Sequence, residues 1–371
     1  MVYRAFVKTI GRLNVVIKRA FYREAILTTL AVSLVLVVLF LFLVLTKLLG
    51  KAAIGEHASG IVFTLLGLEL GRRLEVLIPL AFYLGVLLTF ARWYRDSEMT
   101  VLAACGVGLP SLCRPVVILA TCFAVVVGIL SLYLSPKASA LSEQAKNDDA
   151  NRTTITSASA GIFTELRNSG RIFYAEKISA GPTFENIFVY DKNAAKTNIL
   201  VASSGEQYQD SQTGEEFLVL RNGSVYEGTA GERDYRITKF DNYRLRLIAK
   251  EDDRPATNVE GLPSWTLLKS SNPRHAAEFQ WRLAKPISVV LLAVLALVLA
   301  HTDARRGRVG NLLGAILIYF VYTNMLGIGE TWLKDGSVPT AIGLWWVHGA
   351  LAITTAYLLK RRMQNKPLLA L

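Results

Sequence analysis

Six apolar stretches alternate with polar segments along this chain. The first, residues 25–46, contains no charged side chain, and about 20 apolar residues suffice to cross the hydrocarbon core of a bilayer. The other five are residues 74–91, 115–134, 286–300, 310–329 and 341–359. The fourth stretch is short, so we expect Trp281 to extend it and Lys285 to reach toward the headgroups. The pattern predicts six transmembrane helices.

The long gap between the third and fourth stretches has a different pattern. Short runs rich in Ile, Phe, Tyr, Val and Thr alternate there with Gly, Asn and Pro turns, which is typical of β-strands. Asn222-Gly223 is the strongest hairpin signal. The spacing predicts an all-β, jellyroll-like or sandwich domain inserted between helices 3 and 4. The expected strands are Gly161–Leu166, Arg171–Lys177, Phe184–Tyr190, Asn198–Ala202, Glu216–Leu220, Ser224–Glu227, Arg233–Phe240 and Tyr243–Ile248.

Apolar residues of these strands have two interpretations. Ile172, Phe173 and Phe188 either pack as the core of the domain or line a groove for the tails of an amphiphile. Their alternation with polar residues is visible but not strict. The sequence leaves both interpretations open.

Charge sets the expected topology. The chain has a net charge of +12, yet residues 137–278 carry 18 Lys and Arg against 20 Asp and Glu. The excess cations fall in alternate gaps, and cytoplasmic loops are the ones enriched in Lys and Arg. We therefore expect both termini in the cytoplasm, the β domain outside, and no binding of nucleic acid. The expected divisions are a basic segment 1–24, helices 1–3 over 25–136, the β domain with its linkers over 137–278, helices 4–6 over 279–360, and a basic tail 361–371.

The sequence contains no motif for catalysis or for metal binding. It lacks a G-x-x-x-x-G-K-[ST] loop, an H-E-x-x-H pair and a C-x-x-C pair, and its four histidines are far apart. The centres of the apolar stretches also lack Asp and Glu, which ion-coupled transporters use as relays. We expect no enzyme and no cofactor on this chain. Energy for transport would come from a partner ATPase that binds ATP and Mg²⁺.

Residues 96–106, in the gap between the second and third stretches, predict a short helix. Ser97 suits an N-cap, Glu98 suits the first turn, and Gly106 suits the end of a helix. Met99 begins an apolar stripe that continues with Leu102 and Ala103. One interpretation is a helix lying on the membrane surface, and the other is a coupling helix that docks into a cytosolic ATPase.

Four cations flank the first outer gap. Lys47 and Lys51 follow the first apolar stretch, and Arg72 and Arg73 precede the second. They either reach to lipid headgroups or form a basic collar for the phosphates of a lipid in the outer leaflet. Glu69 and Glu75 would partly neutralise such a collar.

Several motifs together resemble the lipopolysaccharide export permease family. They are L-L-G-L at 65–68, L-I-P-L at 77–80, L-G-V-L-L-T at 84–89, S-E-M-T-V at 97–101 and A-C-G at 104–106. The outer segments at 160–163, 172–174, 187–189, 227–229 and 236–238 look similar too. The S-E-M-T-V…A-C-G combination looks more like the F-type than the G-type subunit. The resemblance runs from about Val16 to the last apolar stretch.

The resemblance implies a six-helix subunit in the bacterial inner membrane with a periplasmic β-jellyroll. Its partners would be a G-type permease subunit, a cytosolic ABC ATPase dimer, periplasmic jellyroll bridge proteins and a single-span accessory subunit. The complex would extract lipopolysaccharide and pass it to the bridge toward the outer membrane. The family pattern assigns ATPase contact to Glu98 and phosphate contact to Lys47, with Lys51 as a neighbour. Arg72 and Arg73 match no family position.

Two alternatives remain on the sequence. A mechanotransmission or lipoprotein-release subunit typically carries its large outer domain after the first helix, whereas here it follows the third. A non-transporting anchor would use the β domain to scaffold periplasmic partners, and it would not need the basic collar.

Overall fold

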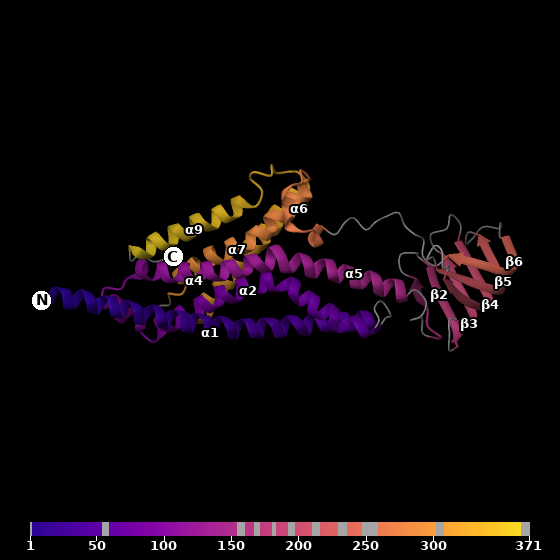
Figure 1. The fold of residues 1–371 in the computed structure, drawn as a ribbon, viewed down its shortest axis with the longest axis horizontal. Coiled ribbons are helices and arrows are strands. Elements are labelled where there is room, and N and C mark those ends of the chain that lie inside the picture. Colours follow the sequence, from indigo (N-terminus) through magenta and orange to yellow (C-terminus); the bar gives the residue numbers. More distant parts are fainter. Residues whose placement is uncertain are drawn as a thin grey trace. The chain divides into compact units, whose positions relative to one another are not determined.

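The computed structural model describes residues 2–53, 59–153, 160–166, 171–179, 183–191, 197–209, 216–228, 236–246, 259–301 and 308–364 (Figure 1). Long helices precede and follow one β-sheet. The helices are α1 (Val2–Ala53), η1 (Ser59–Ile61), α2 (Val62–Arg95), α3 (Glu98–Ala104), α4 (Leu109–Ile129), η2 (Leu130–Leu134), α5 (Ser135–Thr153), η3 (Val259–Gly261), α6 (Ser264–Leu268), α7 (Pro273–Leu299), α8 (Arg308–Lys334) and α9 (Trp345–Met363).

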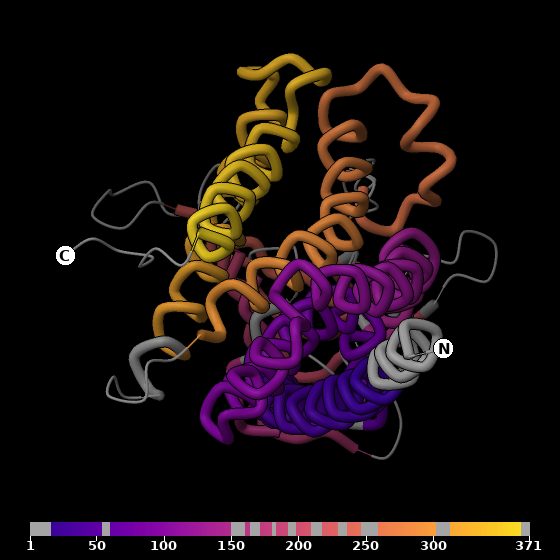
Figure 2. Tube along the Cα trace, turned by 90° about the vertical axis from the view of Figure 1, so that its left-hand side faces the viewer, coloured from indigo at the N-terminus to yellow at the C-terminus, as the bar shows by residue number. Residues whose placement is uncertain are grey.

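The chain divides into two compact units. The first comprises residues 1–43, 67–141 and 258–371, and the second comprises residues 44–66 and 142–257. In the first unit, α7 contacts α4, α8 and α9. Figure 2 views these helices from one end, with α4 in magenta, α7 in orange and α9 in yellow. The most buried helix, α7, is therefore the centre of the first unit.

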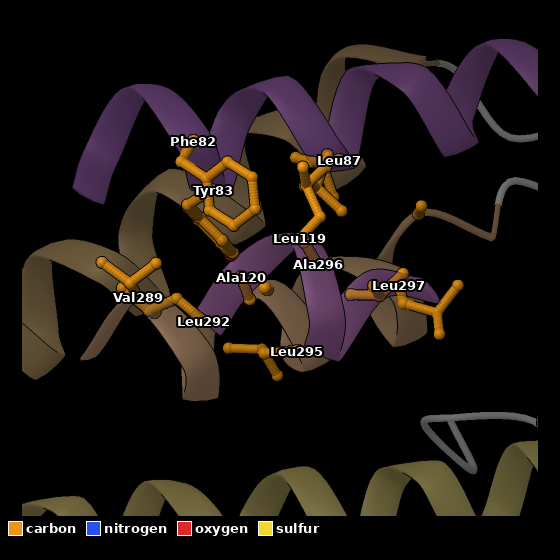
Figure 3. Packing of buried hydrophobic residues seen from close by; sticks show 14 of the residues in the cluster. Phe82, Tyr83, Leu87, Leu119, Ala120, Val289, Leu292, Leu295, Ala296 and Leu297 are labelled. Atoms are coloured by element: carbon orange, nitrogen blue, oxygen red, sulfur yellow. The ribbon is translucent and has the colours of Figure 1, made fainter. Parts of the chain in front are cut away.

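Aromatic and aliphatic side chains of α2, α4 and α7 form the core of the first unit (Figure 3). Phe82 stacks on Phe123 with ring centroids 4.4 Å apart. Tyr83 is fully buried, and its hydroxyl donates to the Ala315 carbonyl of α8 at 3.1 Å. The hydrogen bond satisfies the one polar atom of an otherwise apolar contact.

Helices α1 and α2 approach closely at a glycine. A Cβ atom added at Gly85 would lie 2.9 Å from the Thr29 Cα, closer than real Cβ contacts allow. Phe21 of α1 also stacks on Phe90 of α2, with ring centroids 5.1 Å apart. Gly85 thus lets the two backbones meet, as small residues do between membrane helices.

Five helical segments are long and apolar enough to cross a membrane: Val16–Ala53, Val62–Arg95, Leu109–Asp149, Pro273–Leu299 and Leu312–Lys334. They contain the first five predicted apolar stretches, apart from the ends of the fourth and fifth. Helix α9 is not among them, so a sixth crossing stays a prediction. It also begins at Trp345 and not at 341, because a turn with Gly343 at φ 38° precedes it.

The sheet is an antiparallel meander in which each strand pairs with the next along the chain. The strands that the sequence predicts do form a β-sheet, and the structure shows that it is antiparallel. The jellyroll stays a prediction, because the described strands form a single sheet. The strands are β1 (Thr164–Leu166), β2 (Arg171–Ile178), β3 (Thr183–Asp191), β4 (Thr197–Gln209), β5 (Glu216–Gly228) and β6 (Arg236–Arg246).

The predicted hairpin at Asn222-Gly223 is wrong. Strand β5 continues through these two residues without reversing and so joins two of the expected strands. Strand β6 also joins two of the expected strands. Asn222 does adopt the left-handed conformation that favours Asn and Gly, with φ 51°. It uses this conformation to kink a strand and not to reverse the chain.

The kink crosses strands β2 to β6 as a row of five positions that lack a ladder partner: Glu176, Asn186, Ser203, Asn222 and Asp241. Asn186 is also left-handed, with φ 49°. Its side-chain amide donates to Glu176 at 2.5 Å, and the Ser203 hydroxyl donates to the Asn222 carbonyl at 3.0 Å. The register is the same on both sides of the row, so no strand gains an extra residue there.

The kink row folds the sheet onto itself. On β3 the buried residues are Ile187, Val189 and Asp191 on one side of the row and Phe184 on the other, so the inward parity changes at Asn186. Phe173 and Phe184 would lie about 16 Å apart along a flat sheet, yet their rings are 5.5 Å apart. The two halves therefore pack face to face around one core.

The linkers on each side of the sheet are partly helical. Residues 137–152 lie in α5. The return linker contains η3 and α6 and ends where Asn272 caps α7 by accepting from the Arg274 amide at 2.9 Å. The sequence predicts linkers within 137–278, and residues 247–258 of that range lie outside the described residues.

Candidate functional site

The predicted coupling segment forms the short helix α3. Its start is exposed at Glu98, whereas Met99 is buried and Leu102 packs against the same core cluster. Ala103, the third residue of the expected stripe, is exposed. The helix is thus held to the bundle by two residues and presents the rest of its surface outward.

The ends of α3 differ from expectation in one respect. Ser97 occupies the N-cap position, but it is left-handed, with φ 61°, and its side chain makes no capping hydrogen bond. Ser97 therefore stands at the expected N-cap position but does not cap the helix through its side chain. Gly106, with φ 82°, follows the last turn as predicted, and its amide donates to the Ala103 carbonyl at 3.0 Å.

Ion pairs fix the position of α3 relative to α1 and α2. Arg92 donates to Glu24 of α1 at 2.6 Å and to Glu98 at 3.3 Å. The Trp93 indole donates to the other oxygen of Glu24 at 2.7 Å. Beside them, a hydrogen bond from Arg95 lowers the pKa of the exposed Asp96 carboxyl. The Asp96 carboxylate beside α3 is thus charged at neutral pH.

The four predicted phosphate-binding cations belong to two different units. Lys47 and Lys51 are one turn apart near the end of α1, where Lys47 is exposed and Lys51 is half-buried. Leu48, between them, packs on Val62 and Leu65 of α2. This packing holds the last turns of α1 in place and leaves the Lys47 side chain in solvent.

Arg72 and Arg73 already have carboxylate partners. Arg72 donates to Glu69 and to Glu260 at 2.7 Å each, and Arg73 donates to Glu69 at 3.4 Å. Glu69 neutralises this pair as expected, but Glu75 does not: it faces Lys285 instead. Phosphate binding at Arg72 would have to compete with two ion pairs.

The three predicted groove residues lie on opposite faces of the sheet. Phe173 points into the core and is fully buried. Ile172 and Phe188 are half-buried on the outer face, where Phe163 packs against Phe188 and Tyr174. A single groove on one face cannot include all three residues.

The sequence analysis missed a buried ion pair in the first unit. Lys285 Nζ lies 4.0 Å from Glu75, over the Trp281 ring at 3.5 Å, and neither charged side chain is more than 10% exposed. The expectation that Lys285 reaches to the headgroups is therefore wrong. Each charge was visible at the edge of an apolar stretch, where a buried charge needs a partner, but no local pattern paired Glu75 with Lys285.

Arg282 is a second missed residue. It is 2% exposed and makes hydrogen bonds to the segment Val259–Ser264 as well as an ion pair to Glu278 at 2.8 Å. Its position i+4 from Glu278 in the sequence was a visible signal for a helical pair, but nothing in the sequence indicated the carbonyl groups around it.

Two helices leave long apolar faces uncovered. On α1, Leu34 is 66% exposed, and on α8, Phe320 is 62% exposed. The exposed members of these faces are Leu27, Leu30, Leu34, Val35, Val38, Leu39, Phe42, Leu43, Leu313, Ile316, Leu317, Phe320, Val321 and Ile328. Such faces contact lipid or a partner helix. Within the described ranges, no three His, Cys, Asp or Glu side chains gather closely enough to bind a metal ion together.

Comparison with known proteins identifies the family. The family "Lipopolysaccharide export system permease LptF/LptG" matches residues 19–361. The chain is similar to the lipopolysaccharide export system permease protein LptF of Escherichia coli K12 and to the LptF of Shigella flexneri. Each is 28% identical over 340 residues, which cover 90% of this chain and 91% of the relative. This chain therefore belongs to the lipopolysaccharide export system permease LptF/LptG family.

Proposed function

We propose that this chain is the F-type permease subunit of an ABC transporter in the inner membrane. With a G-type partner and a separate cytosolic ATPase dimer, it extracts lipopolysaccharide from the membrane and passes it to a periplasmic bridge. The uncovered apolar faces of α1 and α8 carry this proposal, because a lipid-extracting permease needs an apolar surface that its own helices do not fill. The β-sheet would be the first periplasmic site that the extracted lipid contacts.

The ATPase would act on this subunit through α3. The helix exposes Glu98, is anchored from behind by Met99, and is linked through Glu98 to Arg92 of α2, which also pairs with Glu24 of α1. A force applied to α3 is therefore passed directly to α1 and α2. Because α1 has an uncovered apolar face, its displacement changes the space that is available to a lipid beside it.

Replacement of Glu98 by Ala tests this role. Arg92 keeps Glu24 as a partner, so we expect the folded stability to change by less than about 0.5 kcal/mol, as for an exposed pair. Lipid transferred per ATP hydrolysed should fall in proteoliposomes that contain the whole complex. Thr100→Ala, exposed on the same helix, is the matched control. Undiminished transfer by the Glu98 variant would rule out its coupling role.

The alternative function is a scaffold that transports no lipid. The basic residues at the end of α1 distinguish a transporter, which needs them, from such a scaffold, which does not. Charge reversal at Lys47 and Lys51 should weaken crosslinking of lipopolysaccharide to a photoreactive residue at position 42, an exposed site on α1. If the charge-reversed variant still binds the ATPase and its crosslinking to lipopolysaccharide is unchanged, the scaffold is favoured. A second photoreactive residue at Phe188 reports whether lipid reaches the outer face of this sheet.

A further inference from the structure

Two chain segments connect the first unit to the sheet, and both pass Arg282. The outgoing segment runs through α4, η2 and α5, and the returning segment enters at Val259–Ser264 before α6 and α7. Arg282 lies on α7, fully inside the unit. All of the contacts below are within the first unit.

The Arg282 guanidinium holds the returning segment. It donates to the carbonyls of Glu260 and Leu262 at 2.9 Å each, to the Ser264 hydroxyl at 2.8 Å and to the Val259 carbonyl at 3.4 Å. Its Nε donates to Glu278 at 2.8 Å, which balances the buried charge. This arrangement uses the planar fork of Arg, which the single ammonium of Lys cannot reproduce.

The outgoing segment is tied to the same point. The Ser131 hydroxyl donates to the Arg282 carbonyl at 3.0 Å, and the Ser264 hydroxyl donates to the Leu132 carbonyl at 2.7 Å. Both contacts fall on η2, a π-helical turn between α4 and α5. Such turns interrupt the regular helical hydrogen bonds and frequently occur at functional positions. Here the carbonyl of Leu132 in the π-helical turn accepts a bond from the returning segment.

Helix α2 joins the cluster from its outer end. Arg72 donates to the Glu260 carboxylate at 2.7 Å, and the Ser135 hydroxyl donates to the Arg72 carbonyl at 3.4 Å. Displacement of α2 or α7 is therefore passed to both segments at once. Movement of the returning segment away from α7 breaks hydrogen bonds of a buried guanidinium, which is costly. Movement of the outgoing segment away from either partner breaks the bonds from Ser131 to the Arg282 carbonyl and from Ser264 to the Leu132 carbonyl.

We propose that Arg282 is the positioning residue that transmits motion of the helical bundle to the β domain. It makes the outgoing and returning segments move together with α7. The inference rests on the proposed function, because it assumes that the bundle moves when the ATPase works. Arg282 touches neither lipid nor nucleotide in this role. It acts by keeping the two segments in one arrangement.

Distances between spin labels test the clamp directly. The labels are placed at Leu141→Cys on the outgoing segment and Leu268→Cys on α6, both exposed, with Cys105, Cys113 and Cys122 replaced by Ser. We expect one narrow distance distribution in the assembled complex, the same with and without a non-hydrolysable ATP analogue. Arg282→Lys should broaden it or make it depend on the nucleotide. Arg274→Lys, exposed on the same helix, should leave it unchanged.

Transport measurements on the same samples test the transmission. In the Arg282→Lys complex, lipid transferred per ATP should fall about fivefold or more, the lower end of a typical coupling between two sites. A broadened distribution with normal transfer would show a purely structural clamp and overturn the proposal. Reduced transfer with an unchanged distribution, or no change in either, would overturn it too.

A second variant and a control on the unmodified complex distinguish a failure to assemble, and a failure of the proposed function, from a failure of the clamp. If the Arg282 variant fails to assemble, Ser264→Ala removes the bond to Leu132 and one bond to Arg282, and the same broadening and loss of transfer are expected from it. An unaltered Ser264→Ala complex would then reject the clamp. If the unmodified complex transfers no lipopolysaccharide, the proposed function fails, while the label distances still decide whether Arg282 holds the two segments together.

Discussion

Glu75 and Lys285 are opposite charges in the interior of a bundle of apolar helices. They lie 4.0 Å apart, and the second oxygen of Glu75 and the ammonium of Lys285 have no hydrogen-bond partner in the described part of the chain. A buried pair of this kind adds little net stability, because desolvation offsets the attraction, but the loss of one partner leaves an uncompensated charge.

Replacement of Glu75 by Gln should therefore lower the free energy of unfolding by about 3–5 kcal/mol. Combining Glu75→Leu with Lys285→Met should restore most of it, since no buried charge is left. Thermal unfolding of the purified protein in detergent measures both. The control is Lys334→Met, which removes a pair to Glu330 that is 44% exposed on the lysine side and should cost less than about 1 kcal/mol. Equal losses at Glu75 and Lys334 would contradict this account.

Single residues were the least predictable part of the structure. Glu98 and Gly106 lie where their residue types suggested, because helix ends follow local rules. Lys285 and Arg282 do not: their partners are 210 and 22 positions away, at Glu75 and Glu260. A local pattern contains no information about a partner that only the packing of α2, α7 and the returning segment provides.

At the scale of elements, helices were predicted well and strands only in part. Apolar stretches of membrane length leave little choice but a helix. The strands keep strict alternation only within each half, because the inward parity changes at the kink row. Strand β5 was therefore interpreted as two strands joined by a turn. The residue type of Asn222 favoured that interpretation, because Asn222 does adopt the left-handed conformation that is common in turns. The signal for a turn and the signal for a kink are the same.

The kink row makes a prediction about Asn222. A left-handed residue with a Cβ costs about 1–2 kcal/mol unless it is Gly, Asn or Asp, so Asn222→Val should destabilise the sheet by about that amount and Asn222→Gly should not. Protection of sheet amides from hydrogen exchange in the full chain measures the effect. Asn242→Val, one residue from the row on an exposed strand position, is the control. Loss of protection with Gly as severe as with Val would show that the backbone conformation is not the cause.

At the scale of the whole molecule, the number of membrane crossings depends on α9, the helix for which a crossing is still a prediction. This helix has 19 residues, about 28 Å of length, close to the hydrocarbon thickness of a bilayer. Its polar residues lower its mean hydropathy, but two of them point inward: His348 shares a hydrogen bond with Tyr322 at 2.9 Å, and Thr355 is buried. Its outward residues include Ile353 and Tyr357. The surface of α9 is thus more apolar than its sequence average.

We therefore expect α9 to cross the membrane and to return the chain to the side of α3. Its first turn carries Trp345 and Trp346 and its last turn carries Lys360–Arg362, which matches an outer aromatic belt and a cytoplasmic basic end. A membrane-impermeant maleimide should label Gln364→Cys from the same side as the native Cys105, and Ser337→Cys from the opposite side. Labelling of positions 337 and 364 from one side would mean that α9 lies along the membrane surface. The basic end of the chain would then face away from the ATPase that we propose binds α3.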